Sequence, residues 1–171
     1  MVEEKLMEFW ENKRIEDEKR LKQYEDCENI KSKFLQNQIK EVKAVWHLDK
    51  KDIDFTLQPD KLNAELIADY ILIESVKTDV LIKSLQNKDA YLKNKLFSDI
   101  WDEYNILHII HCWLNNQPLI PPTIMFNKNL GECMAVDGKH RLNVAYHFGH
   151  EFLPIIIPKT NYDEVKKKLD L

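Results

Sequence analysis

The first quarter of the chain has the pattern of a helix. From Val2 to about Trp46 there is no glycine or proline, and Lys, Glu and Gln dominate, a composition that favours helix. Apolar residues return at helical spacing, most clearly at Leu35, Ile39, Val42 and Trp46. The pattern predicts one long helix or two over this region.

Within this helical region an apolar patch is set apart from the other apolar residues. The patch comprises Leu6, Met7, Phe9 and Trp10. Between residues 11 and 20 the only large apolar residue is Ile15, so that stretch is expected to be solvated. Two interpretations stay open: the patch folds back on the body of the protein, or it binds a partner, which includes a second copy of the chain.

Shorter patterns follow. Residues Asp52 to Leu57 alternate polar and apolar side chains, which predicts a short half-buried strand ended by Pro59. Helical spacing resumes over residues 60–75, although the β-rich run from Tyr70 to Ile73 could interrupt it. The sequence therefore predicts a strand and then a helix in this region.

The middle of the chain is predicted to be helical. Thr78 or Asp79 is a good N-cap for one helix. Residues 89–115 carry apolar side chains on one helical stripe, which indicates one or two further helices.

Beyond this region, strand patterns replace the helical ones. The proline-rich residues 118–122 favour an extended path. Residues 123–126 and 132–136 read as two strands, and residues 127–131 as the hairpin loop between them.

The C-terminal part alternates helix and strand. A helix is predicted from Lys139 to Phe148, with Gly149 just beyond its end. The apolar run from Phe152 to Ile157 predicts a buried strand, and a last helix is predicted to be capped near Thr160 or Asn161. The fold class is therefore α/β (α+β), with a small mixed sheet and helices.

Composition sets the scale of this fold. With 171 residues, of which 44% are hydrophobic, the chain can bury one core. We expect a helical N-terminal extension over residues 1–48 and a single domain over residues 49–171. A net charge of −4 gives no general attraction to nucleic acid or to anionic membranes.

Cysteine usage and apolar run length bear on location. The three cysteines, Cys27, Cys112 and Cys133, are far apart and form no CxxC motif, which fits a reducing cytoplasm. The apolar runs are too short to span a bilayer. We expect a cytoplasmic protein without membrane contact.

Candidate chemistry gathers at one turn. The chain has only three glycines, Gly131, Gly138 and Gly149, and the second opens the predicted helix from Lys139. A helix start carries unpaired backbone N–H groups and the positive end of the helix dipole. Asp137, Gly138, Lys139, His140 and Arg141 therefore form a predicted anion site, in which the basic side chains supply donors.

Structural explanations of the same residues stay open. Asp137 could serve as an N-cap. Arg141 could pair with an internal carboxylate, either Glu132 or Asp137, instead of a ligand.

The residues of this turn carry a family resemblance. The run Asp137-Gly138-Lys139-His140-Arg141-Leu142, with its flanking strands, resembles the core of the ParB/sulfiredoxin-like superfamily over about residues 119–157. Members carry D-G-x-H-R-L or G-x-x-R-x-x-A here. The resemblance implies a ParB/sulfiredoxin-like fold in which Gly138, His140 and Arg141 cradle the phosphates of a nucleotide such as ATP, ADP or CTP.

Departures from the family pattern narrow this expectation. Sulfiredoxins have a catalytic cysteine where this chain has Lys139, so we do not expect sulfinic acid reduction. Partition proteins continue into a second nucleotide motif and a helix-turn-helix, whereas fourteen residues follow Ile157 here. Val144 stands where the motif has alanine.

Catalysis would need a base or a carboxylate that holds Mg²⁺. The candidates are Asp137, Glu132, Asp52 and Asp54, and the sequence does not choose among them. No metal site is predicted, because His108, His111 and Cys112 read as packing residues of an apolar helix.

Three functions follow from these patterns. The first is a nucleotide- or phosphate-binding domain, with hydrolysis of a nucleotide, phosphoryl transfer or phosphodiester cleavage as its chemistry. The alternative is a non-enzymatic adaptor that binds a protein partner or itself through residues 2–46. The third is a DNA-processing, nuclease-like protein of a mobile element.

Overall fold

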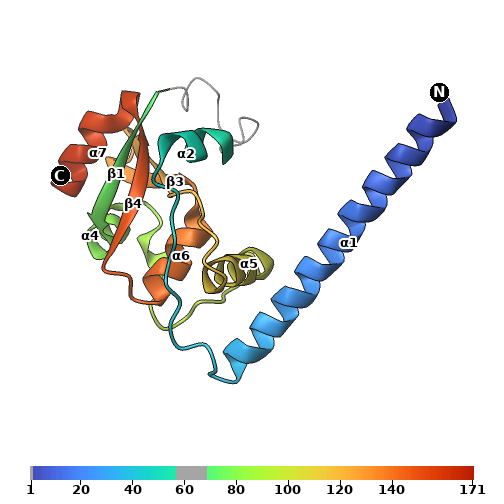
Figure 1. Cartoon of the computed structure of the whole chain (residues 1–171). Helices are drawn as coiled ribbons and strands as arrows, with labels where there is room; N and C mark the ends of the chain where they lie inside the picture. The colour runs from blue at the N-terminus through green and yellow to red at the C-terminus, as the bar shows by residue number, and fades with distance from the viewer. Residues whose placement is uncertain (1, 57–68) are drawn as a thin grey trace. The chain divides into compact units, whose positions relative to one another are not determined.

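The computed structural model describes residues 2–56 and 69–171 (Figure 1). It divides into two compact units, Met1–Lys40 and Glu41–Leu171. The first is a helical extension and the second combines helices with a four-stranded sheet. The predicted α+β class with a helical N-terminal extension is confirmed. Within the described residues, no helix has both the length and the apolar character needed to cross a membrane.

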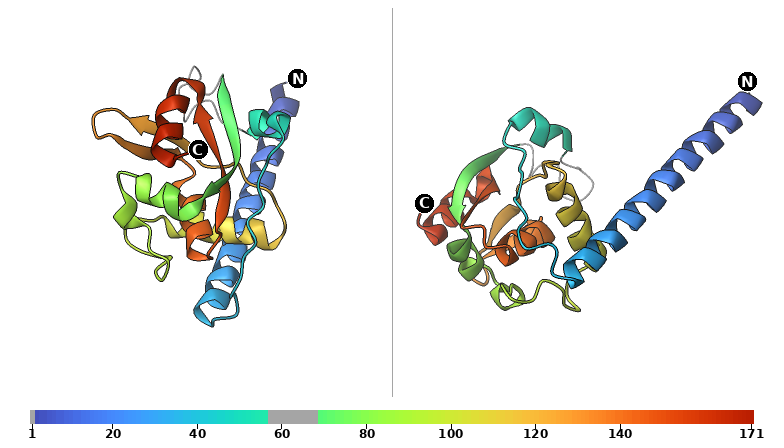
Figure 2. Two further views of the ribbon diagram at one scale, coloured as in Figure 1. Left: turned by 90° about the vertical axis from the view of Figure 1, so that its left-hand side faces the viewer. Right: turned by 60° about the horizontal axis from the view of Figure 1, so that its bottom comes forward.

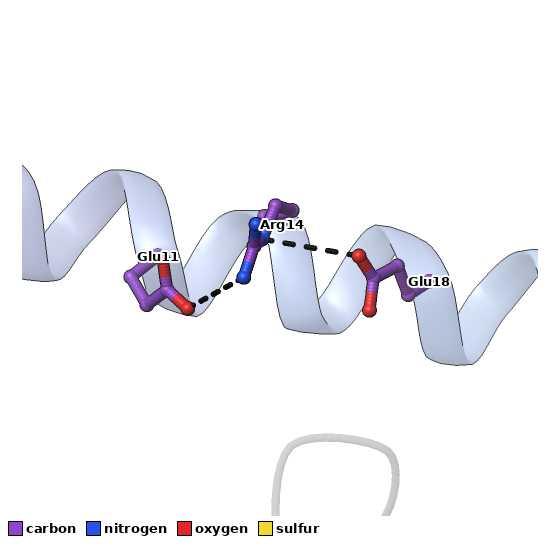
Figure 3. A network of polar contacts seen from close by, with 3 residues as sticks. All are labelled: Glu11, Arg14 and Glu18. Carbon is purple, nitrogen blue, oxygen red and sulfur yellow. Dashed lines mark hydrogen bonds and ion pairs between the residues drawn. The ribbon is translucent and has the colours of Figure 1, made fainter.

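The extension is the single helix α1, Val2–Leu35. Its middle, residues 11–20, is polar apart from Ile15 and carries charged pairs one turn apart. Arg14 contacts Glu11 at 2.8 Å and Glu18 at 3.8 Å (Figure 3). Each exposed pair of this kind contributes only about 0.2–0.5 kcal/mol, so these pairs support the helix without fixing it.

The prediction that the helix continues to Trp46 is wrong. The chain turns at Asn37, which has a positive φ of 55°, and then runs extended. Leu119 donates to the carbonyl of Val45 and accepts from the backbone of His47, both at 3.0 Å. Backbone hydrogen bonds to Leu119, which is distant in the sequence, therefore replace the helical hydrogen bonds that the spacing of Val42 and Trp46 predicted.

The predicted strand at residues 52–57 is also wrong. The chain forms helix α2, Lys50–Thr56, whose first turn is capped by Asp49: its side chain accepts from the backbone of Lys51 at 3.1 Å. The fully buried Ile53 packs against Tyr70 and Ile156. One cap and one anchor residue thus outweigh the alternating pattern.

The predicted helix over residues 60–75 lies partly outside the described residues. Its described end forms strand β1, Tyr70–Lys77, as the β-rich residues there allowed. The other strands are β2, Thr123–Asn127, β3, Glu132–Asp137, and β4, Phe152–Pro158. All three agree with prediction within a residue.

The sheet has the order β1-β4-β2-β3. The pairs β1–β4 and β2–β3 are antiparallel, and β2–β4 is parallel. The left view of Figure 2 shows β1 and β4 side by side. Strand β4 lies between β1 and β2, whereas β3 lies at the edge beyond β2. The connection from β3 to β4, which contains the helix Lys139–His147, therefore passes over β2.

The remaining helices flank the sheet. They are α4, Thr78–Ser84, α5, Glu103–Leu114, α6, Lys139–His147, and α7, Tyr162–Leu169, with short 3-10 turns at Lys88–Ala90 and Lys159–Asn161. Helices α4 and α7 lie on one side of the sheet, and α5 and α6 on the other (Figure 1).

The predicted helix over residues 89–115 is confirmed only from Glu103 onward. Asp102 caps α5, since its carboxylate accepts from the backbone N–H of Asn105 at 3.0 Å. The segment before it, Tyr91 to Asp102, is irregular and packs on α6 through Leu96, whose carbonyl accepts from the side chain of the fully buried Asn143.

Candidate functional site

The predicted anion site lies where β3 ends and α6 begins. Asp137 ends β3, Gly138 is the N-cap with a φ of 74°, and α6 starts at Lys139. A Cβ at Gly138 would lie 2.7 Å from the Cα of Pro122. Both the left-handed backbone and the close approach of Pro122, the residue before β2, therefore require glycine here.

The start of α6 has unused hydrogen-bond donors. Among the residues that the structure describes, no side chain caps it, and its first helical hydrogen bond runs from the N–H of Leu142 to the carbonyl of Gly138 at 2.9 Å. The N–H groups of residues 139–141 precede that bond and point out of the helix end. Together with the helix dipole, they favour an anion at this position.

The side chain of Arg141 lies over this helix end. Its Nη2 lies 2.6 Å from Oδ2 of Asp137, and the same atom lies 2.9 Å from where a Cβ of Gly138 would stand. The guanidinium thus folds back over the glycine. The Arg141 side chain is 16% exposed and that of Asp137 38% exposed, so solvent reaches the pair mainly from the carboxylate side.

Arg141 was expected either to bind a ligand or to pair with an internal carboxylate, Glu132 or Asp137, and in the structure it forms such a pair. Its partner is Asp137 and not Glu132. Glu132 begins β3, opposite Asn127, and five residues of strand place it roughly 16 Å from Asp137. Of the four carboxylates considered for catalysis, only Asp137 lies at the turn.

The imidazole of His140 is already engaged. Its Nε2 accepts from the backbone N–H of Asp102 at 3.2 Å, and its ring meets that of Trp101 edge-on at 5.6 Å. Burial lowers the pKa of His140, and the charge of Lys139 lowers it further, against the opposing effect of the Asp102 carboxylate. His140 is therefore a neutral ring that positions the turn, and contributes less charge than the sequence predicted.

Lys139 completes the set of predicted ligand residues. It is exposed on the first turn of α6. Lys139 and Arg141 carry two positive charges against the single negative charge of Asp137. The turn therefore has a net positive charge in a chain whose overall charge is negative.

Sequence reasoning missed one residue of this site. Thr123, the first residue of β2, is the cross-strand partner of Asp137. It is 4% exposed, and its hydroxyl has no hydrogen-bond partner within the described part of the chain. No local pattern marks this threonine, because its importance depends on the register between β2 and β3.

The other candidate residues lie elsewhere. Asp52 and Asp54 are on α2, and Asp54 accepts from the hydroxyl of Tyr70 at 2.7 Å. Burial, and then this bond, raises the pKa of Tyr70 well above its usual value. His108 and Cys112 contact each other at 3.6 Å inside α5. Among the described residues, no three His, Cys, Asp or Glu side chains are grouped to hold a metal ion.

Comparison with known proteins adds no relative: no protein-family model, no curated protein and no solved structure matches this chain. The resemblance to the ParB/sulfiredoxin-like superfamily therefore stays an expectation that depends on the turn residues alone.

Proposed function

We propose that the turn from Asp137 to Arg141 binds the phosphate groups of a nucleotide or of another phosphate-containing ligand. The observation that carries this proposal is the uncapped start of α6 with the guanidinium of Arg141 held directly over Gly138. A phosphate at this point would accept from the N–H groups of residues 139–141 and from Arg141.

Each residue has a distinct role in this proposal. Gly138 lets the ligand approach the backbone, since it has no side chain over the helix end. Lys139 adds an exposed positive charge, and Arg141 offers a planar fork that matches phosphate oxygens. His140 holds the turn against Asp102 and Trp101.

Chemistry on the bound phosphate would fall to Asp137. In the free protein its carboxylate is occupied by Arg141. When Arg141 turns to the phosphate, that carboxylate is released and can hold Mg²⁺ or accept a proton, which hydrolysis or phosphoryl transfer requires. The proposal is for binding first, with catalysis dependent on this exchange.

Thermal stabilisation by ATP, ADP, CTP and GTP, with and without Mg²⁺, tests the proposal. Ligand at a hundred times its Kd stabilises the folded state by about 2.7 kcal/mol, which a melting curve resolves. Arg141→Ala should abolish the shift. Arg14→Ala is the matched control, because it removes an arginine from the exposed middle of α1. If no nucleotide stabilises the wild type, or if the shift survives in Arg141→Ala, nucleotide binding at this turn is wrong.

One observation favours a second function, that of an adaptor. On α1, Met7 is 75% exposed, and the exposed rings of Phe9 and Trp10 meet at 5.5 Å. Exposed apolar groups of this kind mark interaction surfaces. Sedimentation of the full chain and of a chain lacking residues 1–20 tests self-association through this segment. A monomer in both cases would remove that form of the hypothesis.

A further inference from the structure

The hydroxyl of Thr123 is the least explained polar group at the site. Thr123 is buried, with only 4% of its surface exposed, and its hydroxyl oxygen has no hydrogen-bond partner among the described residues. A buried hydroxyl without a partner is unfavourable and uncommon. A methyl group of the same shape, as in valine, would avoid this penalty.

The neighbourhood of this hydroxyl is defined by the sheet. Thr123 is paired with Asp137 of β3 and with Ile156 of β4. The register between β2 and β3 shifts at Thr123, so Val136 and Asp137 of β3 together oppose this one residue, as in a β-bulge. Val136 and Ile156 are apolar, so the polar residue paired with Thr123 is Asp137.

That carboxylate is occupied in the free protein. Its Oδ2 accepts from Arg141 at 2.6 Å. Phosphate binding by Arg141, on which this inference depends, removes that donor. The carboxylate is only 38% exposed, so losing its partner would oppose ligand binding.

We propose that Thr123 is the second hydrogen-bond donor to Asp137, and that it replaces Arg141 as the donor when phosphate binds. In the free protein Arg141 donates to Asp137, and the hydroxyl of Thr123 is idle. In the bound protein Arg141 donates to phosphate, and the hydroxyl of Thr123 donates to Asp137. Thr123 is thus a positioning residue: it stabilises the carboxylate that Arg141 leaves, and it does not contact the ligand.

Thr123→Val removes the hydroxyl and keeps the shape of the side chain. We expect the free protein to keep its melting temperature or to gain a few degrees, because the hydroxyl makes no bond there. Affinity for phosphate should fall by about tenfold, the effect of one hydrogen bond to a charged group. A merely structural role would lower stability and affinity together.

Isothermal titration with ADP and with inorganic pyrophosphate measures this effect. Thr123→Ser keeps the hydroxyl and should bind within about twofold of the wild type, since the donor to the charged group is retained. If Thr123→Val folds poorly, Thr123→Ala serves as a second variant without the hydroxyl. Its affinity for phosphate should fall by the same factor. In an Asp137→Ala background, Thr123→Val should change affinity no further, because the acceptor that the hydroxyl serves is gone.

The outcomes separate this inference from the proposed function. If the wild type binds neither probe, both are wrong. If the wild type binds and Thr123→Val binds equally well, only the exchange is wrong. If Thr123→Val weakens binding by the same factor in the Asp137→Ala background, Thr123 acts independently of Asp137, which also overturns the exchange.

Discussion

The substitution Gly138→Ala tests the geometry on which the site depends. Two effects should destabilise this variant. The φ of 74° lies in the left-handed region, where a non-glycine residue costs about 1–2 kcal/mol. The Cβ would also lie 2.7 Å from the Cα and 3.0 Å from the Cβ of Pro122, and relieving such a backbone overlap costs about 1–3 kcal/mol.

The expected destabilisation is therefore about 2–5 kcal/mol. Gly149 offers a matched control, because its φ of 75° is the same and a Cβ there would meet nothing within 4 Å. Gly149→Ala should cost only the backbone term of about 1–2 kcal/mol. The difference between the two variants reports the contacts of the new Cβ with Pro122 and with Nη2 of Arg141, which would lie 2.9 Å away.

Urea unfolding followed by tryptophan fluorescence measures both values, since Trp101 and Trp113 are buried in the unit that contains the turn. The m-values should match the wild type, so that midpoints report stability. Equal destabilisation by Gly138→Ala and Gly149→Ala would refute the reasoning. It would mean that Pro122 moves away from the turn without lowering the free energy of unfolding.

Three further predictions concern packing, pH and charge. Ile53→Ala should destabilise the protein by about 2–4 kcal/mol, because Ile53 of α2 is fully buried against Tyr70 and Ile156; a loss below about 1 kcal/mol in urea unfolding would contradict this packing. Burial lowers the pKa of His140, so the unfolded chain takes up protons first and stability should fall as the pH drops below about 6.5. His140→Gln should flatten that slope in urea midpoints between pH 7 and 5, and an unchanged slope would count against the buried neutral ring. Arg14→Ala should change stability by less than about 0.5 kcal/mol, whereas a larger loss in thermal unfolding would show that the Glu11–Arg14–Glu18 contacts act as a network.

Much of the C-terminal half followed from the sequence. The hairpin of β2 and β3 and the strand β4 could be predicted because their patterns are local: Gly131 closes the hairpin, and the apolar run before Pro158 forms the buried strand. The start of α6 at Gly138 was equally local, since a glycine after a strand both ends it and opens a helix.

Local pattern failed where distant contacts decide the backbone. Residues 38–47 have helical spacing, but Trp46 pairs with Leu119 and packs edge-on against Trp113 at 5.0 Å. Residues 52–56 alternate like a strand, but Asp49 caps a helix there and Ile53 anchors it. In the first case tertiary contacts outweigh propensities worth tenths of a kcal/mol per residue. In the second case a local cap acts together with one buried anchor residue.

The site divides in the same way. The sequence alone determined that Asp137 to Arg141 form a glycine-opened helix start with basic side chains, because turn chemistry depends on adjacent residues. Only the tertiary structure decided that Arg141 pairs with Asp137, that Glu132 lies at the far end of the strand, and that His140 holds Asp102. Thr123 joins the site for the same reason: the register of β2 on β3 brings it opposite Asp137 from fourteen residues away, and register depends on the pairing of whole strands.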